Sequence, residues 1–392
     1  MLRDKKIILG VASSVAIYKA LDLVRLLKKR GADVHVVMTT HATELISPQL
    51  FHAISGNRVW FKQFDSDSND PMAHVGMLQE ADLVMLVPAT ASLVGRYAMG
   101  LATDLLTTML LGTKAPVLLA PAMNTHMYQH PIVQANLIKL KSMGVEVIEP
   151  VEGLLACGIY GSGHLSALET IVLRAERLLG PKDLAGKKVL ISSGRTMESL
   201  DPVRVLSNRS SGKMGRALAR VAFVRGAGVT IVSGGVDVAY PEDIEVVWVE
   251  SALEMHEAVL AKFSTSDVFV SAAAVGDFRP IKSAKSKLKK SGESLFLELI
   301  ENPDILKAVV RLKKPHQQVV GFALETNDLI QNAQTKFEDK GVDLLVANSD
   351  QVLSEDAGDF VLFSRRSHRS ISSTKEELSH YLFNKLSLLR KN

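Results

Sequence analysis

The chain has 392 residues, of which 47% are hydrophobic and 22% charged, and its formal net charge at pH 7 is +4. This length suggests two or three domains, and the composition excludes a disordered or fibrous chain. The mildly basic balance, with 2 Trp and 6 Tyr to stack on bases, does not favour nucleic acid as a partner. A single cysteine cannot form an internal disulfide, so we expect an intracellular, cytoplasmic protein.

The first half of the chain alternates buried strands with helices. The N-terminal stretch resembles a signal peptide, because basic residues precede an apolar stretch. We reject this interpretation, since KKIILG is typical of a buried parallel strand that leads into a helix over 14–31. No uninterrupted apolar run reaches the roughly 18 residues that span a bilayer, so we expect no membrane association. Further strands are predicted at DVHVVMT, ADLVMLVPA, APVLLAPA and VEVIEP, with helices at DLLTTMLLG and ALETIVLRAERLLG.

The second half repeats this pattern after a break at Gly180 and Pro181. Strands are predicted at KKVLISSG, GVTIVSG, DVFVSAAA and QVVGFALE, with a helix after SSGKMG and another at ALEMHEAVLAKF. The fold class is therefore α/β, with two doubly wound domains of mostly parallel sheets, one flavodoxin-like or Rossmann-like and one Rossmann-like. We place the domains at residues 1–182 and 183–392.

Ligands of such sheets bind beyond the carboxyl ends of the strands, so the loops there hold the candidate site residues. Ser13 and Ser14 precede a helix and are suited either to a phosphate or to capping the helix with no ligand. Thr39 offers a hydroxyl at the same edge. These stretches lack the GxGxxG pattern, so a nicotinamide dinucleotide is not favoured.

Three further residues have both a structural and a functional interpretation. Asn124 in PAMNTHMY is suited to capping a helix, and His74 to a helix surface. Cys157, a type that is usually a small buried hydrophobe, lies here between glycines that allow a loop to close over a ligand. The pair His126 and His130 lacks an intervening carboxylate and a third ligand, so a zinc site is not favoured.

Several motifs carry a resemblance to known families. In the first half, PMAH, VPAT, PAMNTHMY and ACGIYGSG resemble, in this order, the flavin-dependent phosphopantothenoylcysteine decarboxylases. In the second half, DPVRVLSNRSSGKMG, AAAVGDFRP, KLKKSG, ENPDIL and VGFALETN resemble the phosphopantothenate-cysteine ligases. The fusion in this order, over nearly the whole chain, resembles the bacterial bifunctional enzymes of coenzyme A biosynthesis.

The first resemblance implies an FMN cofactor, which oxidises the substrate's cysteinyl thiol so that decarboxylation has an electron sink, and then rereduces the product to 4'-phosphopantetheine. It implies that Asn124 holds the substrate carboxylate, with Met127 lining the pocket. His74 would orient the substrate or assist thiol deprotonation, and Cys157 would be the proton donor on a flap. The FMN contacts would come from Ser13, Ser14, Thr39, Pro88, Ala89 and Thr90.

The second resemblance implies activation of 4'-phosphopantothenate by CTP, with Mg²⁺ on the phosphates, and attack of cysteine on the acyl-cytidylate. Lys287 and Lys289 would neutralise the pyrophosphate, although their lysine run is also typical of a solvated loop. Arg204 and Asn208 would handle the acyl intermediate. Substrate contacts are implied for Ala273, Ala274, Asp277, Asn302, Pro303, Asp304, Ile305, Phe322, Lys336 and Lys340, and no metal ligand is assigned.

The chain departs from the family pattern at a few positions, including Ser92 after the PAT motif and His164 where the flap usually has arginine. The resemblance also implies a homo-oligomer, with a trimer-based decarboxylase half and a dimeric ligase half. The alternative is a flavin-binding regulatory or interaction protein that lacks decarboxylase turnover.

Overall fold

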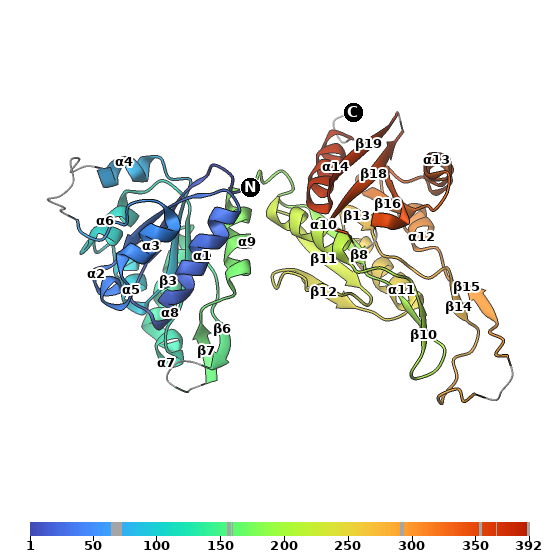
Figure 1. Ribbon diagram of the computed structural model, residues 1–392, viewed down its shortest axis with the longest axis horizontal. Coiled ribbons are helices and arrows are strands. Elements are labelled where there is room, and N and C mark those ends of the chain that lie inside the picture. The colour runs from blue at the N-terminus through green and yellow to red at the C-terminus, as the bar shows by residue number, and fades with distance from the viewer. Residues whose placement is uncertain are drawn as a thin grey trace. The chain divides into compact units, whose positions relative to one another are not determined.

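The chain folds into two compact units, Met1–Gly180 and Pro181–Asn392 (Figure 1). No helix among the described residues is long and apolar enough to cross a membrane. This computed structural model describes residues 1–63, 73–154, 158, 160–290, 294–352, 355–365 and 367–389, and of residues 73–75 the backbone alone.

The first unit is built on a parallel sheet of five strands in the order β2-β1-β3-β4-β5. Its strands are β1 (Lys6–Val11), β2 (Asp33–Met38), β3 (Leu83–Ala89), β4 (Val117–Pro121) and β5 (Glu146–Val147). An antiparallel hairpin of β6 (Val151–Leu154) and β7 (Tyr160–His164) lies outside this sheet. The helices are η1 (Val15–Ile17), α1 (Tyr18–Lys29), α2 (Thr40–Leu45), α3 (Pro48–Ser55), α4 (Ala73–Gln79), α5 (Ala91–Met99), α6 (Leu105–Gly112), α7 (Thr125–Gln129), α8 (Pro131–Ser142) and α9 (Leu168–Leu179).

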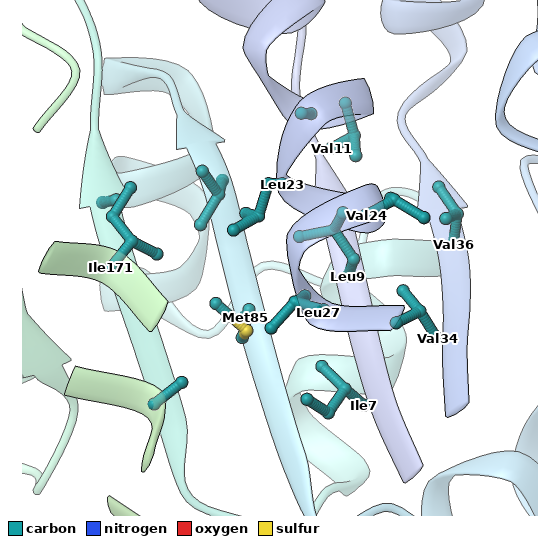
Figure 2. Close-up of a cluster of buried hydrophobic side chains, with 14 of the residues drawn as sticks. Ile7, Leu9, Val11, Leu23, Val24, Leu27, Val34, Val36, Met85 and Ile171 are labelled. Atoms are coloured by element: carbon teal, nitrogen blue, oxygen red, sulfur yellow. The ribbon is translucent and has the colours of Figure 1, made fainter. Parts of the chain in front are cut away.

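Apolar side chains cover both faces of this sheet. Figure 2 shows one face, where Leu23, Val24 and Leu27 of α1 are fully buried. They belong to a cluster with Ile7, Leu9 and Val11 of β1, Val34 and Val36 of β2, Met85 of β3 and Ile171 of α9. Ile8 points to the other face and packs in a second cluster. Because helices cover both faces, β1 is continuously apolar rather than alternating.

The second unit has a sheet of eight strands in the order β12-β11-β8-β13-β16-β17-β18-β19. The strands from β12 to β17 are parallel, and β18 and β19 complete the sheet as an antiparallel hairpin. Their bounds are β8 (Lys188–Ser193), β11 (Gly228–Ser233), β12 (Glu245–Trp248), β13 (Val268–Ser271), β16 (Gln318–Leu324), β17 (Leu344–Asn348), β18 (Ala357–Ser364) and β19 (Ser367–Thr374).

Helices and two small hairpins surround this sheet. The helices are α10 (Lys213–Val224), α11 (Ala252–Phe263), α12 (Ile305–Leu312), α13 (Leu329–Lys340), η2 (Asp350–Val352) and α14 (Lys375–Leu389). The hairpins pair β9 (Met197–Ser199) with β10 (Val205–Ser207), and β14 (Phe278–Pro280) with β15 (Leu299–Glu301). Figure 1 shows the second hairpin on an arm that extends away from the sheet.

The predicted fold class is confirmed, because both units are α/β with mostly parallel sheets. Two local predictions differ from the structure. The predicted strand over 145–150 pairs only at Glu146–Val147, at the edge of its sheet. The helix predicted over 14–31 begins as a 3₁₀ turn, since Ser14 caps η1 before α1 starts at Tyr18.

Candidate functional site

In the first unit, hydroxyl side chains gather where the parallel strands end. Ser14 follows β1, accepts a hydrogen bond from the amide of Ala16 and donates one over 3.1 Å to the carbonyl of Ala122, just beyond β4. Thr39 follows β2, is buried and caps α2, while Thr90 follows β3 and caps α5. The helix-capping interpretation of Ser14 is therefore confirmed, and Thr39 and Thr90 cap helices at the same edge of the sheet.

Backbone contacts hold these loops together. The amide of Ala12 donates over 3.3 Å to the carbonyl of Pro88, and the amide of Ala122 donates over 3.0 Å to the carbonyl of Ala89. Ala89 is fully buried, whereas Ser13 is exposed. The FMN residues expected from the sequence thus lie on loops that are in direct contact at this edge.

The segment after β4 carries Asn124, whose side-chain oxygen accepts a hydrogen bond over 2.8 Å from the amide of His126 and so caps α7. Met127, one turn on, is half exposed. Strand β7 runs beside this segment, because the amide of Met123 donates over 3.1 Å to the carbonyl of Gly163. The flap strand is therefore anchored directly beside Asn124.

The two remaining decarboxylase candidates are not located at side-chain level. His74 lies in α4, of which the structure describes only the backbone at this position, and Cys157 lies outside the described residues.

An FMN cofactor fits the polar groups present at this edge. The hydroxyl of Thr125 is buried and has no hydrogen-bond partner among the described residues. It faces Gly161, where an added Cβ would come within 2.7 Å of the hydroxyl oxygen. A buried donor that the protein leaves unpaired costs about 1–3 kcal/mol, and a hydrogen bond to a ligand or to a water molecule would offset that cost.

In the second unit, a cavity of about 380 Å³ opens at the carboxyl ends of the parallel strands. It is lined by six of the residues expected to contact substrates: Asn208, Ala273, Ala274, Asp277, Phe322 and Lys336. The structure thus brings together residues that are more than a hundred positions apart in the sequence. Arg204, Lys287, Lys289, Asn302, Pro303, Asp304, Ile305 and Lys340 do not line it.

Hydrogen bonds fix one wall of this cavity. The side-chain amide of Asn208 donates to the carbonyls of Ala274 (3.2 Å) and Val275 (3.1 Å). The amide side chain of Asn302 donates over 2.8 Å to the carbonyl of Gly276, and its backbone amide donates over 2.8 Å to the carbonyl of Asp277. Asn302 is therefore hydrogen-bonded to the segment that forms the cavity wall and does not itself line the cavity.

The buried carboxylate of Asp201 organises the neighbouring loops. It accepts hydrogen bonds from the amides of Val203 and Arg204, both over 2.8 Å, and from the amide of Leu288 over 3.1 Å. The hydrogen bond from Leu288 and those from the other two amides lower the pKa of Asp201. The guanidinium of Arg204 bonds both the Asp201 carboxylate and the Leu288 carbonyl, each over 3.0 Å. Arg204 and Asp201 thereby hold the lysine-rich loop in place.

The remaining ligase candidates lie on this loop and at the start of α12. Lys287 and Lys289, on either side of Leu288, are exposed. Asp304 caps α12 and forms an ion pair with Lys340; burial raises its pKa, but hydrogen bonds from Lys340 and from an amide of α12 outweigh this and lower it. Pro303 is partly buried, and Ile305 is buried in the core.

Several cavity residues were missed by sequence reasoning. Lys213, in the SSGKMG motif, is the first residue of α10 and forms an ion pair with Asp356 over 2.9 Å. Lys375, at the start of α14, is buried and donates over 3.1 Å to the carbonyl of Val352; burial, and then the nearby charge of Lys213, lower its pKa. The glycine at position 215 was the one sequence signal that the start of α10 lies close to the sheet. An added Cβ there would lie 1.9 Å from Ser193 Oγ, so α10 can approach β8 this closely only with glycine at that position.

Comparison with known proteins identifies both halves. A family model described as Flavoprotein matches residues 1–179, and one described as DNA/pantothenate metabolism flavoprotein C-terminal domain matches residues 184–389. A coenzyme A biosynthesis bifunctional protein CoaBC of Haemophilus influenzae is 40% identical over 390 residues, which cover 98% of this chain and 98% of that protein. The chain belongs to the family of coenzyme A biosynthesis bifunctional proteins.

The chain is also similar to a second relative and to a solved structure. The bifunctional protein of Vibrio vulnificus is 44% identical over 349 residues, covering 88% of this chain and 87% of that one. A crystal structure of the C-terminal domain of a coenzyme A biosynthesis bifunctional protein matches with 34% identity and a TM-score of 0.46, covering 53% of this chain and 97% of that one. The expectation of a bifunctional enzyme of coenzyme A biosynthesis with a flavoprotein half is confirmed, and the regulatory alternative is not favoured.

Proposed function

We propose that residues 1–182 catalyse the FMN-dependent decarboxylation of 4'-phosphopantothenoylcysteine. Residues 183–392 ligate 4'-phosphopantothenate to cysteine with CTP. The observation that carries the proposal is the cavity of the second unit, where Asn208, Asp277 and Lys336 line one space of about 380 Å³. That volume lies within the range of small-molecule sites.

The ligase reaction requires a better leaving group on a carboxylate. CTP supplies it: the carboxylate of 4'-phosphopantothenate attacks the α-phosphorus, pyrophosphate leaves, and the amine of cysteine then displaces CMP. Asn208, held by two carbonyls of the cavity wall, is placed to orient the acyl group. Exposed Lys287 and Lys289 reach pyrophosphate from the loop that Asp201 fixes. Mg²⁺ would bind through the nucleotide phosphates, whose oxygens are the ligands that this ion prefers.

The decarboxylase reaction uses the hydroxyl-lined edge of the first unit. Bound FMN supplies a two-electron acceptor for the cysteinyl thiol of the substrate. Ser13, Ser14 and Thr39 hold its phosphate, with Pro88, Ala89 and Thr90 beside the ring. Asn124 orients the substrate carboxylate, His74 assists deprotonation of the thiol, and Cys157 returns a proton to the product.

We also propose a cytoplasmic homo-oligomer. A single cysteine in 392 residues suits a reducing compartment. The arm that carries β14 and β15 exposes large apolar side chains, including Phe296 at 92% and Leu295 at 63% exposure. Large apolar side chains exposed together on one arm are typical of a subunit interface, which supports a dimeric ligase half. We retain a trimeric decarboxylase half as part of the proposal. Light scattering of the full chain and of an arm variant, Phe296→Ser, tests the dimer.

Mass spectrometry of the products of the full chain tests the two activities. The wild-type protein, given 4'-phosphopantothenate, cysteine, CTP and Mg²⁺, should form 4'-phosphopantetheine. Asn208→Ala should form no ligated product but should still decarboxylate added 4'-phosphopantothenoylcysteine. Asn124→Ser keeps a helix-capping oxygen and should accumulate that intermediate. A wild-type protein that forms neither product would refute the proposed function.

A further inference from the structure

Two basic side chains meet beside the candidate flavin site. Lys19, in the first turn of α1, and His164, at the end of β7, are both partly buried, and Lys19 Nζ lies 3.5 Å from His164 Nε2. The other ring nitrogen of His164, Nδ1, lies 3.2 Å from the carbonyl of Leu165. A proton on Nδ1 satisfies that carbonyl and leaves Nε2 as the acceptor for the Lys19 ammonium.

This pair is joined to the loops of the site through the chain itself. His164 follows Gly163, whose carbonyl accepts the hydrogen bond from Met123, next to Asn124. Lys19 follows the η1 turn that Ser14 caps, and Ser14 in turn bonds the carbonyl of Ala122. The two basic groups therefore border the edge where Asn124 and the flavin-binding hydroxyls lie.

The charge of the Lys19 ammonium is not balanced by an ion pair among the described residues. Within the part of the chain that the structure describes, neither Lys19 nor His164 forms an ion pair with a carboxylate. Burial lowers the pKa of Lys19, so its ammonium is already partly removed from water. An anion that accepts hydrogen bonds from both nitrogens would compensate the unpaired charge of Lys19. Such charge-assisted hydrogen bonds are about twice as strong as neutral ones.

We propose that Lys19 and His164 form a subsite for a phosphate monoester at the decarboxylase site. The proposal rests on the proposed function of the first unit. Lys19 Nζ and a protonated His164 Nε2 both donate to phosphate oxygens, and the imidazole no longer accepts from the lysine. Two compounds at this site carry such a phosphate, the flavin and the 4'-phosphorylated substrate, and the experiment distinguishes them.

The test uses the full chain with Lys19→Met, His164→Ala and the double variant. Decarboxylation is measured with 4'-phosphopantothenoylcysteine and with pantothenoylcysteine, which lacks the phosphate, and the bound FMN is measured by absorbance after desalting. Lys29→Met, at the exposed end of the same helix, is the matched control for the loss of one positive charge. Lys19→Arg keeps a donor and a charge, so it should retain most of the wild-type phosphate binding.

If the substrate's phosphate is bound, KM should rise about tenfold or more for the phosphorylated substrate alone, with kcat and FMN content little changed. If the flavin's phosphate is bound, the variants should lose FMN on desalting. That result supports the subsite and identifies FMN as the compound whose phosphate it holds. Equal changes for both substrates with full FMN content, or no change in any readout, would overturn the subsite while the wild-type activity stands. A wild-type chain without decarboxylation would remove the proposed function and this subsite together, and FMN bound to the same preparation shows that the first unit is folded.

Discussion

Replacing Gly163 by alanine should separate the flap strand from the candidate decarboxylase site. Gly163 has φ of 136°, in the region that residues with a side chain rarely adopt, and an added Cβ would lie 2.3 Å from the carbonyl oxygen of Met123. Such a backbone conformation costs about 1–3 kcal/mol, and relief of the overlap costs about 1–3 kcal/mol more. Because β7 and Met123 must move apart, the hydrogen bond of 3.1 Å between Met123 and Gly163 should be lost.

The loss of about 2–6 kcal/mol is large beside a typical domain stability of about 5–15 kcal/mol. Thermal unfolding of the first unit, followed by flavin fluorescence, should shift down by roughly 5–20 °C. Decarboxylation should fall with it, because Asn124 adjoins the displaced segment, while ligation by the second unit in the same sample should be unchanged.

Gly153→Ala is the matched control on the partner strand β6. An added Cβ there meets the His164 ring at 3.6 Å, which is an ordinary contact, so the cost should stay below about 1 kcal/mol. If Gly163→Ala unfolds at the same temperature as Gly153→Ala and keeps its decarboxylation rate, then the close approach of β7 does not position this site.

Three further predictions each concern one side chain, two in the second unit and one in the first. Asp201→Asn keeps the shape of the side chain but weakens its hold on the amide of Leu288, so kcat/KM for ligation should fall about tenfold without a change in decarboxylation, measured on one preparation. Lys375→Met leaves buried carbonyls without their donor, which costs about 1–3 kcal/mol, and should raise the KM for CTP at least fivefold in steady-state ligation. Burial and the hydrogen bond to Glu149 raise the pKa of Tyr128 to about 12, so its contribution is complete below about pH 10 and is lost as the pH rises towards 12; urea unfolding should show this loss in the wild type and not in Tyr128→Phe.

The parallel strands could be predicted from sequence because strands that are buried on both faces have continuous apolar runs. Strand β1 is covered on both faces, so its positions after Lys6 are buried and favour apolar or small residues. The hairpin of β18 and β19 could not be predicted in this way. The sequence of β19, SHRSISST, is polar and mostly exposed, and its place in the sheet depends on pairing with β18 along its whole length.

The candidate sites were predictable only where a motif kept its residues together. Asn124 was expected at a helix start and lies there, because an N-cap is a local property of the chain. Lys375 could not be found, since its role arises from hydrogen bonds to a carbonyl that lies more than twenty positions earlier. Burial of a lysine depends on tertiary packing, which a charged residue before an ordinary helix does not indicate.

Both units build their sites by letting a backbone segment approach the end of a parallel strand more closely than a side chain would permit. In the first unit Gly163 brings β7 against Met123, and in the second Gly215 brings α10 against Ser193 at the end of β8. The first contact is made by main chain, through the hydrogen bond from Met123 to Gly163 beside Asn124, whereas the second packs α10, which begins at Lys213, against the Ser193 side chain. The glycines of the two motifs therefore have a steric requirement of their own, separate from any contact they make with a ligand.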